Sequence, residues 1–317
     1  MPYCLGLWLV TSSLAQNNSN FCDPWSYRIN DSNDDLGKCQ TLRDRFPAPT
    51  NFVEREYPEY SFQWYLQRLP LKEPNAILQV PSLDKPYEKL DRNPCAAVVD
   101  WPVWMKERQC ADTFMGLFVH WMVRQGIDPE VKIPCYLEDQ WTTELFSYSD
   151  WLRGKTAESN RAGIIVKWNT KQEDRNLDGY LEKIYAWIGT SNFQQAFDLV
   201  EIQDLRDAEV GDLLLKPRTG KPINGHLSFI VNIADSIEET PSLVIIGEGR
   251  TEVKNRIAHG TEMAIRGHPE NVWKTLKLRE DYQLYRLKVL QSPASIETYE
   301  PMIAPESIPT RKIIPTY

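Results

Sequence analysis

The stretch "GHLSFIVNIAD" (225–235) decides the fold class. It opens with Gly225-His226, continues as an apolar β-type run, and lies between two similar runs, "GDLLLKP" (211–217) and "SLVIIGEG" (242–249). Gly, Pro and Asn residues separate the three runs, a pattern typical of consecutive antiparallel strands. The sequence therefore predicts an antiparallel meander here, with His226 at the mouth of a buried strand.

Helical patterns come earlier in the chain. In "ERQCADTFMGLFVHWMVRQG" (107–126) apolar residues recur at spacings of three and four, and Gly126 is a suitable C-terminal stop. "SYSDWLRG" (147–154) and "LDGYLEKIYAWIGT" (177–190) also predict helices. Because helices come mostly first and strands later, we expect an α+β fold in which an antiparallel sheet packs with a few helices.

The remaining segments are assigned by the same patterns. Residues 60–71 predict a strand or turn at the rim of the core, and residues 250–280 are polar and predict irregular structure. Further strands are expected at 96–103, 132–137, 163–169 and 282–290.

The chain has 317 residues, 42% of them hydrophobic and 25% charged, which suits a folded protein and excludes wholesale disorder. We expect a signal peptide at 1–15, an extension at 16–56, a single α+β domain at 57–290 and a proline-rich tail at 291–317. The formal net charge of −8 argues against a nucleic-acid-binding protein.

The N-terminus resembles an export signal. An apolar stretch at 5–10 is followed by Ser13-Leu14-Ala15, which suits cleavage before Gln16, although no Lys or Arg precedes the apolar stretch. No later stretch reaches the roughly 18 apolar residues of a membrane span. We therefore expect an exported protein that is periplasmic, at the cell surface or secreted.

Cysteine usage in an exported chain is informative. The six cysteines are Cys4, Cys22, Cys39, Cys95, Cys110 and Cys135. Cleavage of the signal removes Cys4 and leaves an odd number, so one thiol is left over or pairs between chains. Cys22 and Cys39 bracket a polar segment and suit a local disulfide, whereas Cys95 and Cys135 lie in strand-like segments that neighbouring strands can bring into bridging range. By subtraction Cys110 is the unpaired thiol.

Three residues form a candidate catalytic set. Cys110 is a potential nucleophile, His226 its base, and Glu248 in "IIGEG", one strand after His226, a group that could orient the imidazole. Each has a purely structural alternative. Cys110 lies on the apolar stripe of its own helix, His226 suits a hydrogen-bonded strand end, and Glu248 suits an exposed hairpin.

A metal site is a weaker alternative. "HGTEMAIRGH" supplies His259, Glu262 and His268, which are residue types that bind zinc. The segment is interrupted by glycine and lacks the HExxH spacing. We therefore expect no metal and no cofactor.

Motifs along residues 57–280 resemble the bacterial family of domain of unknown function 4846. They include "CAAVVDWPVWMKERQCADTFMGLFVHWM", "VGDLLLKP", "GHLSFIVNIAD" and "LVIIGEG", in the family's order. Two histidines of the family pattern are replaced here by Cys95 and Cys135. The joint replacement implies two side chains close in space and so supports a Cys95–Cys135 disulfide. A glutamine of the family's last strand corresponds to Glu248, whereas Cys110 and His226 match.

The order of cysteine on a helix, histidine on a strand and polar residue on the next strand also looks like that of papain-like amidases of the NlpC and CHAP type. The resemblance implies a cysteine-dependent amidase or peptidase that acts on cell-wall peptide or amide bonds. Backbone amides near Cys110 would then stabilise the oxyanion. The alternative is a non-catalytic secreted or envelope protein on the same scaffold.

Overall fold

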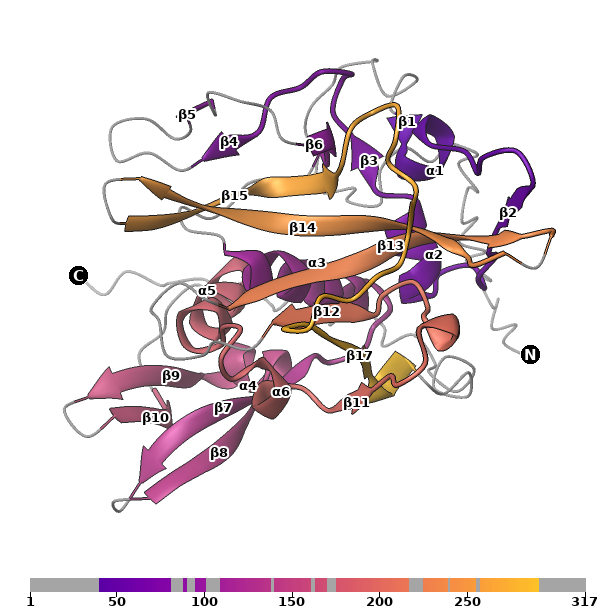
Figure 1. The fold of residues 1–317 in the computed structure, drawn as a ribbon. Coiled ribbons are helices and arrows are strands. Elements are labelled where there is room, and N and C mark those ends of the chain that lie inside the picture. The colour runs from indigo at the N-terminus through magenta and orange to yellow at the C-terminus, as the bar shows by residue number, and fades with distance from the viewer. Residues whose placement is uncertain are drawn as a thin grey trace, which may run out of the picture.

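The computed structural model describes residues 40–80, 88–89, 95–100, 109–137, 140–160, 163–169, 175–216, 225–238, 240–254 and 257–290 (Figure 1). The predicted signal peptide, the Cys22–Cys39 pair and the proline-rich tail lie outside these residues.

An antiparallel sheet organises the described part of the chain. Its strand order is β11-β17-β12-β13-β14-β15-β6, with β2 added to β13 and β16 to β14, and every pairing is antiparallel. The strands are β2 (Phe52–Glu54), β6 (Cys95–Val98), β11 (Leu199–Glu201), β12 (Leu213–Lys216), β13 (His226–Ser236), β14 (Leu243–Lys254), β15 (Ile257–Arg266), β16 (Lys274–Thr275) and β17 (Gln283–Leu287). The predicted α+β class and the antiparallel meander β12-β13-β14 are confirmed.

Helix α3 (Cys110–Arg124) packs against β13 and β14. Its buried aromatic residues recur at helical spacing, and the ring of Phe114 meets Phe229 of β13 edge-on at a centroid distance of 5.1 Å. The helix stops where predicted, because Gly126 adopts a positive φ of 71° that favours glycine. One face of α3 therefore forms the centre of the core.

Residues 60–71 differ from the predicted strand or turn. They form helix α2 (Phe62–Gln67) followed by the short strand β3 (Pro70–Leu71), and the Ser61 side chain caps the helix by accepting the N–H of Trp64. Phe62 packs against the rings of Phe118 and Trp121 in α3. The segment was misjudged because its dense aromatic content has no clear period of two or of 3.6 residues.

Residues 40–54, which we expected in an extension, contribute to the fold. They supply β1 (Gln40–Thr41), which pairs with β3, then α1 (Leu42–Arg45) and β2, which pairs with β13. Leu42 is fully buried in the core. The strands β4 (Gln79–Val80) and β5 (Glu88–Lys89) form a separate pair.

Two hairpins project from the body at the lower left of Figure 1. They consist of β7 (Glu130–Leu137) with β8 (Gln140–Ser147), and β9 (Lys155–Asn160) with β10 (Gly163–Trp168). Helix α4 (Tyr148–Arg153) begins at the Ser147 cap and ends at Gly154, as predicted. Helices α5 (Leu177–Trp187) and α6 (Phe193–Ala196) complete this region.

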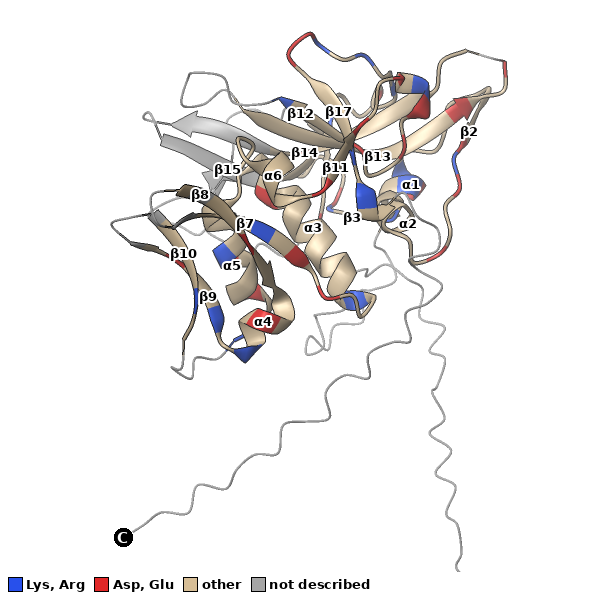
Figure 2. Ribbon diagram, turned by 90° about the horizontal axis from the view of Figure 1, so that it is seen from below, with Lys and Arg blue, Asp and Glu red and all other residues tan. Residues whose placement is uncertain are grey.

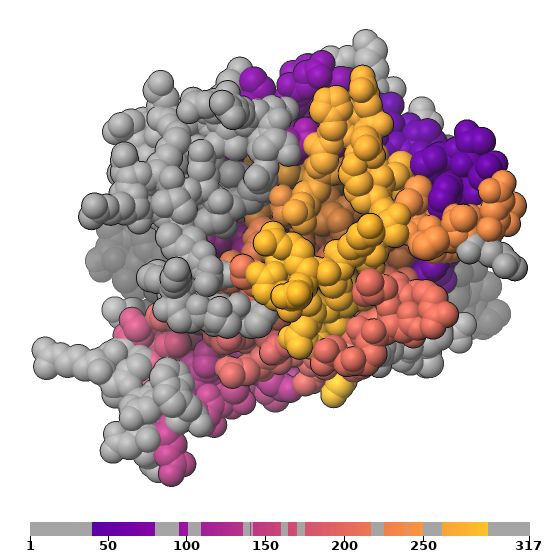
Figure 3. Space-filling view, viewed as in Figure 1, coloured from indigo at the N-terminus to yellow at the C-terminus, as the bar shows by residue number. Residues whose placement is uncertain are grey.

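The segment 250–280 was expected to be irregular, and this expectation is wrong. β14 continues to Lys254, and β15 returns from Ile257 to Arg266 as its partner. The hairpin was not predicted because its strands are rich in polar residues, whereas the strand assignments relied on runs of apolar residues. After β15 the chain crosses the front of the sheet (Figures 1 and 3), and Trp273 in this segment donates its indole N–H to Pro47 O. Elsewhere in the fold, short 3-10 helices lie at Leu205–Asp207 and Lys288–Leu290.

The predicted Cys95–Cys135 disulfide is wrong, because Cys135 keeps a free thiol. Cys95 lies in β6 at one edge of the main sheet, whereas Cys135 lies in β7, whose strand partner is β8. The two strands lie at opposite ends of the view in Figure 1. The joint replacement in these motif positions therefore does not report a contact.

No helix among the described residues is both long and apolar enough to span a membrane.

Candidate active site

The main sheet forks between β13 and β14. The paired register of β13 and β14 ends at Phe229–Gly247. Beyond that point β13 continues beside β12 as far as His226, whereas β14 continues beside β15 as far as Lys254. The two strands therefore separate near the candidate residues, His226 on β13 and Glu248 on β14. Figure 1 shows the two strands diverging toward the left.

Cys110 is the first residue of α3, three residues later than the start predicted for this helix. Gln109 precedes it as the cap, and its backbone N–H is accepted by the Asp112 carboxylate at 2.7 Å. The first N–H groups of a helix have no acceptor within the helix, and the helix dipole is positive at this end. Cys110 thus lies beside backbone N–H groups that have no acceptor within the helix.

Two glycines on β14 sit where a side chain has no room, and one of them, Gly249, lets α3 approach the sheet. A Cβ atom on Gly249 would lie 2.0 Å from Thr113 Oγ1 and 3.2 Å from the carbonyl oxygen of Gln109. A Cβ atom on Gly247 would lie 2.8 Å from the side chain of Val231. Gly249 therefore permits the first turn of α3 to rest on β14 beside Glu248, whereas Gly247 leaves room for side chains of the neighbouring strands β13 and β15.

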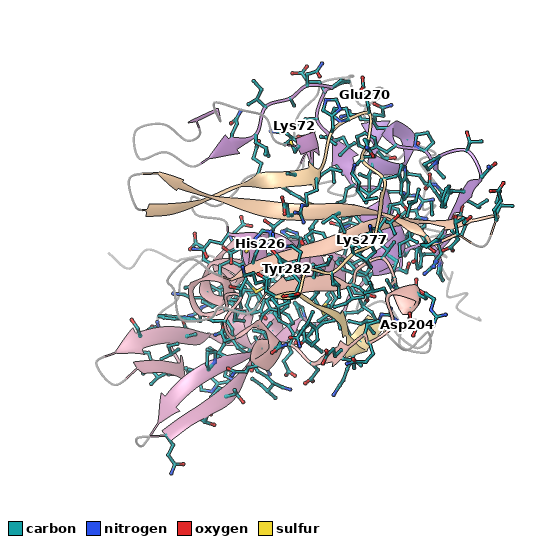
Figure 4. All side chains as sticks on the ribbon, in the orientation of Figure 1. Lys72, Asp204, His226, Glu270, Lys277 and Tyr282 are labelled. Atoms are coloured by element: carbon teal, nitrogen blue, oxygen red, sulfur yellow. The ribbon has the colours of Figure 1, made fainter. Side chains whose placement is uncertain are left out.

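The fork brings the three predicted residues together. His226 Nε2 lies 2.9 Å from Glu248 Oε2, and the Cys110 thiol is near enough to the same ring to raise the pKa of His226. Because Nε2 faces the carboxylate, Nδ1 is the ring nitrogen left to exchange a proton with the thiol. Figure 4 labels His226 at the start of β13.

The three residues of the site differ in how much of each is exposed to solvent. The Glu248 side chain is 6% exposed and the His226 side chain 25% exposed, while Cys110 as a residue is 4% exposed. Glu248 therefore does not lie in the exposed hairpin of its structural alternative. A buried carboxylate requires a partner, and the imidazole supplies one.

The charge state of His226 follows from these contacts. Burial opposes the charged ring, but hydrogen bonds to Cys110 and Glu248 outweigh burial and raise the pKa of His226 to about 9. The ring is therefore an imidazolium at neutral pH. An imidazolium next to a cysteine is the arrangement that stabilises a thiolate nucleophile.

Arg266 is a member of this site that the sequence did not reveal. Its Nε lies 3.6 Å from the same Glu248 oxygen that faces His226, and half of its side chain is exposed. It lies on β15, two residues beyond Ala264, which pairs with Glu248. The position follows from strand register, and the segment was predicted to be irregular, so no sequence signal pointed to it.

Two of the alternative metal ligands, Glu262 and His268, have other partners in the described structure. Glu262 forms an ion pair with Lys72 Nζ at 2.6 Å and accepts the N–H of Gln79, and His268 Nδ1 accepts the N–H of Glu270. The His259 side chain lies outside the described atoms. Among the described residues no group of three or more His, Cys, Asp or Glu side chains could hold a metal ion.

Comparison with known proteins gives one match. The sequence model of the family described as "Domain of unknown function (4846)" matches residues 42–251, a range that contains Cys110, His226 and Glu248. No curated protein and no solved structure matches the chain. Because the match covers more than half of the sequence, the chain belongs to the family of domain of unknown function 4846.

Proposed function

We propose that this protein is an exported cysteine-dependent hydrolase that cleaves peptide or other amide bonds. One observation carries the proposal: His226 is held by Glu248 at 2.9 Å, and Cys110, at the start of α3, is near enough to raise the pKa of the same ring. This grouping supports roles for the three residues as nucleophile, base and orienting group, the set that cysteine hydrolases use.

The reaction uses the imidazolium and thiolate as a pair. The Cys110 thiolate attacks the carbonyl carbon, and a C–S bond forms while the carbonyl oxygen gains negative charge. The N–H groups at the start of α3 stabilise that oxyanion, since they have no acceptor within the helix. His226 gives its proton to the amide nitrogen, the C–N bond breaks and the amine leaves.

Water completes the cycle. His226 takes a proton from water, and the resulting hydroxide attacks the acyl-enzyme carbonyl and breaks the C–S bond. The thiolate and the imidazolium are restored, and the net reaction adds one water to one amide. Glu248 keeps Nε2 of the ring engaged throughout, which leaves Nδ1 for both proton transfers.

The substrate class rests on the resemblance to NlpC- and CHAP-type amidases, which act on cell-wall peptides. The test is incubation of the full chain with purified peptidoglycan and with simple peptide amides, followed by mass spectrometry of the products. We expect new amines from the wild type and none from Cys110→Ala. Cys135→Ala is the matched control, because Cys135 is also a buried free thiol but lies in the β7–β8 hairpin.

The low exposure of Cys110 favours a second candidate, a non-catalytic envelope or secreted protein in which the same three residues only stabilise the fork. The two candidates predict opposite results. A silent scaffold yields identical products from wild type and Cys110→Ala, and Cys110→Ala then lowers only the unfolding free energy.

A further inference from the structure

A second concave site lies at the opposite end of α3 from Cys110. The cavity, of about 690 Å³, is lined by residues of α1, α2 and the last turn of α3, among them Tyr60, Trp64, Arg68 and Arg124. Its volume is within the range of small-molecule sites. Because α3 spans Cys110–Arg124 at about 1.5 Å per residue, roughly 20 Å separates the two sites. Figure 2 shows α1 and α2 next to each other on the same side of α3.

The cavity presents aromatic rings at an angle to one another. Tyr60 is 54% exposed, and its ring lies 5.6 Å from that of Trp64 with 43° between their planes. The Tyr60 backbone has a φ of 65°, which is costly for a bulky residue. The Trp121 indole holds this conformation by donating its N–H to Tyr60 O at 2.8 Å.

Cations at the cavity differ in how far they are neutralised. Arg43 forms ion pairs with Glu54 at 3.0 Å and with Glu56, and the Asp44 carboxylate is occupied by the hydroxyl of Thr41 at 2.6 Å. Arg43 and Asp44 are therefore already engaged by neighbouring residues of the fold.

Arg68 and Arg124 are different, because neither has an ion-pair partner among the described residues. Arg68 stacks on Trp64, with Cζ 4.3 Å from the ring centroid. Burial, together with the charge of Arg43, lowers the pKa of Arg68. Arg124 is exposed at the end of α3. Glu56, Glu59 and Asp44 are near enough to oppose the lowering of the Arg68 pKa, but none of them pairs with its guanidinium. In a chain of net charge −8, two guanidinium groups that no described carboxylate engages directly, beside an aromatic wall, suit an anionic ligand.

We propose that this cavity binds an acidic saccharide. The C–H faces of a pyranose pack on the rings of Tyr60 and Trp64, and a ring carboxylate pairs with Arg68 and Arg124. Rings tilted by 43° do not form the parallel sandwich that a flat base prefers, and Arg68 already covers one face of Trp64. The Gln125 amide, which also lines the cavity, is available to hydroxyl groups.

Calorimetric titration of the full chain with digalacturonate tests the proposal, with neutral cellobiose and planar AMP as comparison ligands. Digalacturonate should bind, cellobiose should bind at least about tenfold more weakly, and Arg124→Ala should weaken digalacturonate by about tenfold, the effect of one charge-assisted contact. Arg206→Ala is the matched control, because Arg206 is 88% exposed and lies in a different part of the fold.

Tyr60→Gly separates binding from folding. Glycine accepts the positive φ without strain, so the melting temperature should hold or rise while binding is lost. Cys110→Ala should bind digalacturonate as the wild type does, since the site does not depend on the proposed hydrolase. The proposal is overturned if digalacturonate fails to bind, if cellobiose or AMP binds as tightly, or if Arg206→Ala weakens binding as much as Arg124→Ala.

Discussion

Glu248 and Glu262 lie on the paired strands β14 and β15, and both carboxylates are buried. Glu248 faces His226 at 2.9 Å and the half-exposed Arg266 at 3.6 Å, whereas Glu262 faces Lys72 at 2.6 Å. The difference lies in what adjoins the cation. The His226 ring, whose pKa is raised to about 9, lies near the Cys110 thiol, whereas Lys72 ties residues near β3 to the sheet. A buried carboxylate thus becomes part of a candidate active site only when its partner titrates beside a nucleophile.

The largest expected difference between the two sites is in amide hydrolysis after His226 or Lys72 is replaced. His226→Ala removes the proton carrier, so we expect amide hydrolysis to fall by about 10³-fold with the fold retained. Lys72→Ala should leave the turnover of the folded enzyme within a few fold of wild type. Initial rates measured alongside circular dichroism decide this, and equal losses of turnover in the two variants would remove the distinction.

Stability should show the opposite ranking. Lys72→Ala leaves the 3%-exposed Glu262 side chain without its counter-ion, which should cost about 3 kcal/mol of unfolding free energy. Lys72→Met and Glu262→Gln made together should recover most of that loss. Urea denaturation measures each value, and an unchanged midpoint for Lys72→Ala would show that this pair contributes nothing.

The pH dependence of stability should distinguish the two carboxylates further. The pKa of His226 is about 9 in the folded chain and near 6.5 when unfolded, so its contribution is fully present below pH 6.5 and is lost as the pH rises through about 9. We expect a decline of about 3 kcal/mol over that interval. Glu248→Gln should flatten it; Glu262→Gln should not. Identical slopes in both variants would contradict the assignment.

The smallest predicted effect concerns the glycine that allows α3 to approach β14. Gly249→Ala places a methyl group against Thr113 and should cost about 1–2 kcal/mol while displacing Cys110 from His226. Gly189→Ala is its control, because no atom lies within 4 Å of the added Cβ. Thermal unfolding and Cys110 alkylation measure both consequences, and the same result for both variants would show that the close approach is unimportant.

The sequence anticipated the meander and the three residues of the fork because apolar runs and a strand-to-strand neighbour relation are local signals. It could not place Cys110 at the start of α3, since "ERQ" before it is as compatible with a helix as the residues that follow. Arg266 was missed because its place depends on the register of a polar hairpin. The Cys95–Cys135 disulfide was predicted wrongly because the two motif positions carry no information on the distance between β6 and β7, which belong to different sheets.

The reactivity of Cys110 tests the central claim most directly. Limited alkylation with iodoacetamide at neutral pH, followed by peptide mapping, compares Cys110 with the buried thiol of Cys135, whose pKa burial raises. We predict that Cys110 is modified much faster than Cys135 in the wild type and loses that advantage in His226→Ala. Equal, slow modification of both thiols, unchanged by the histidine substitution, would contradict a reactive Cys110–His226 pair.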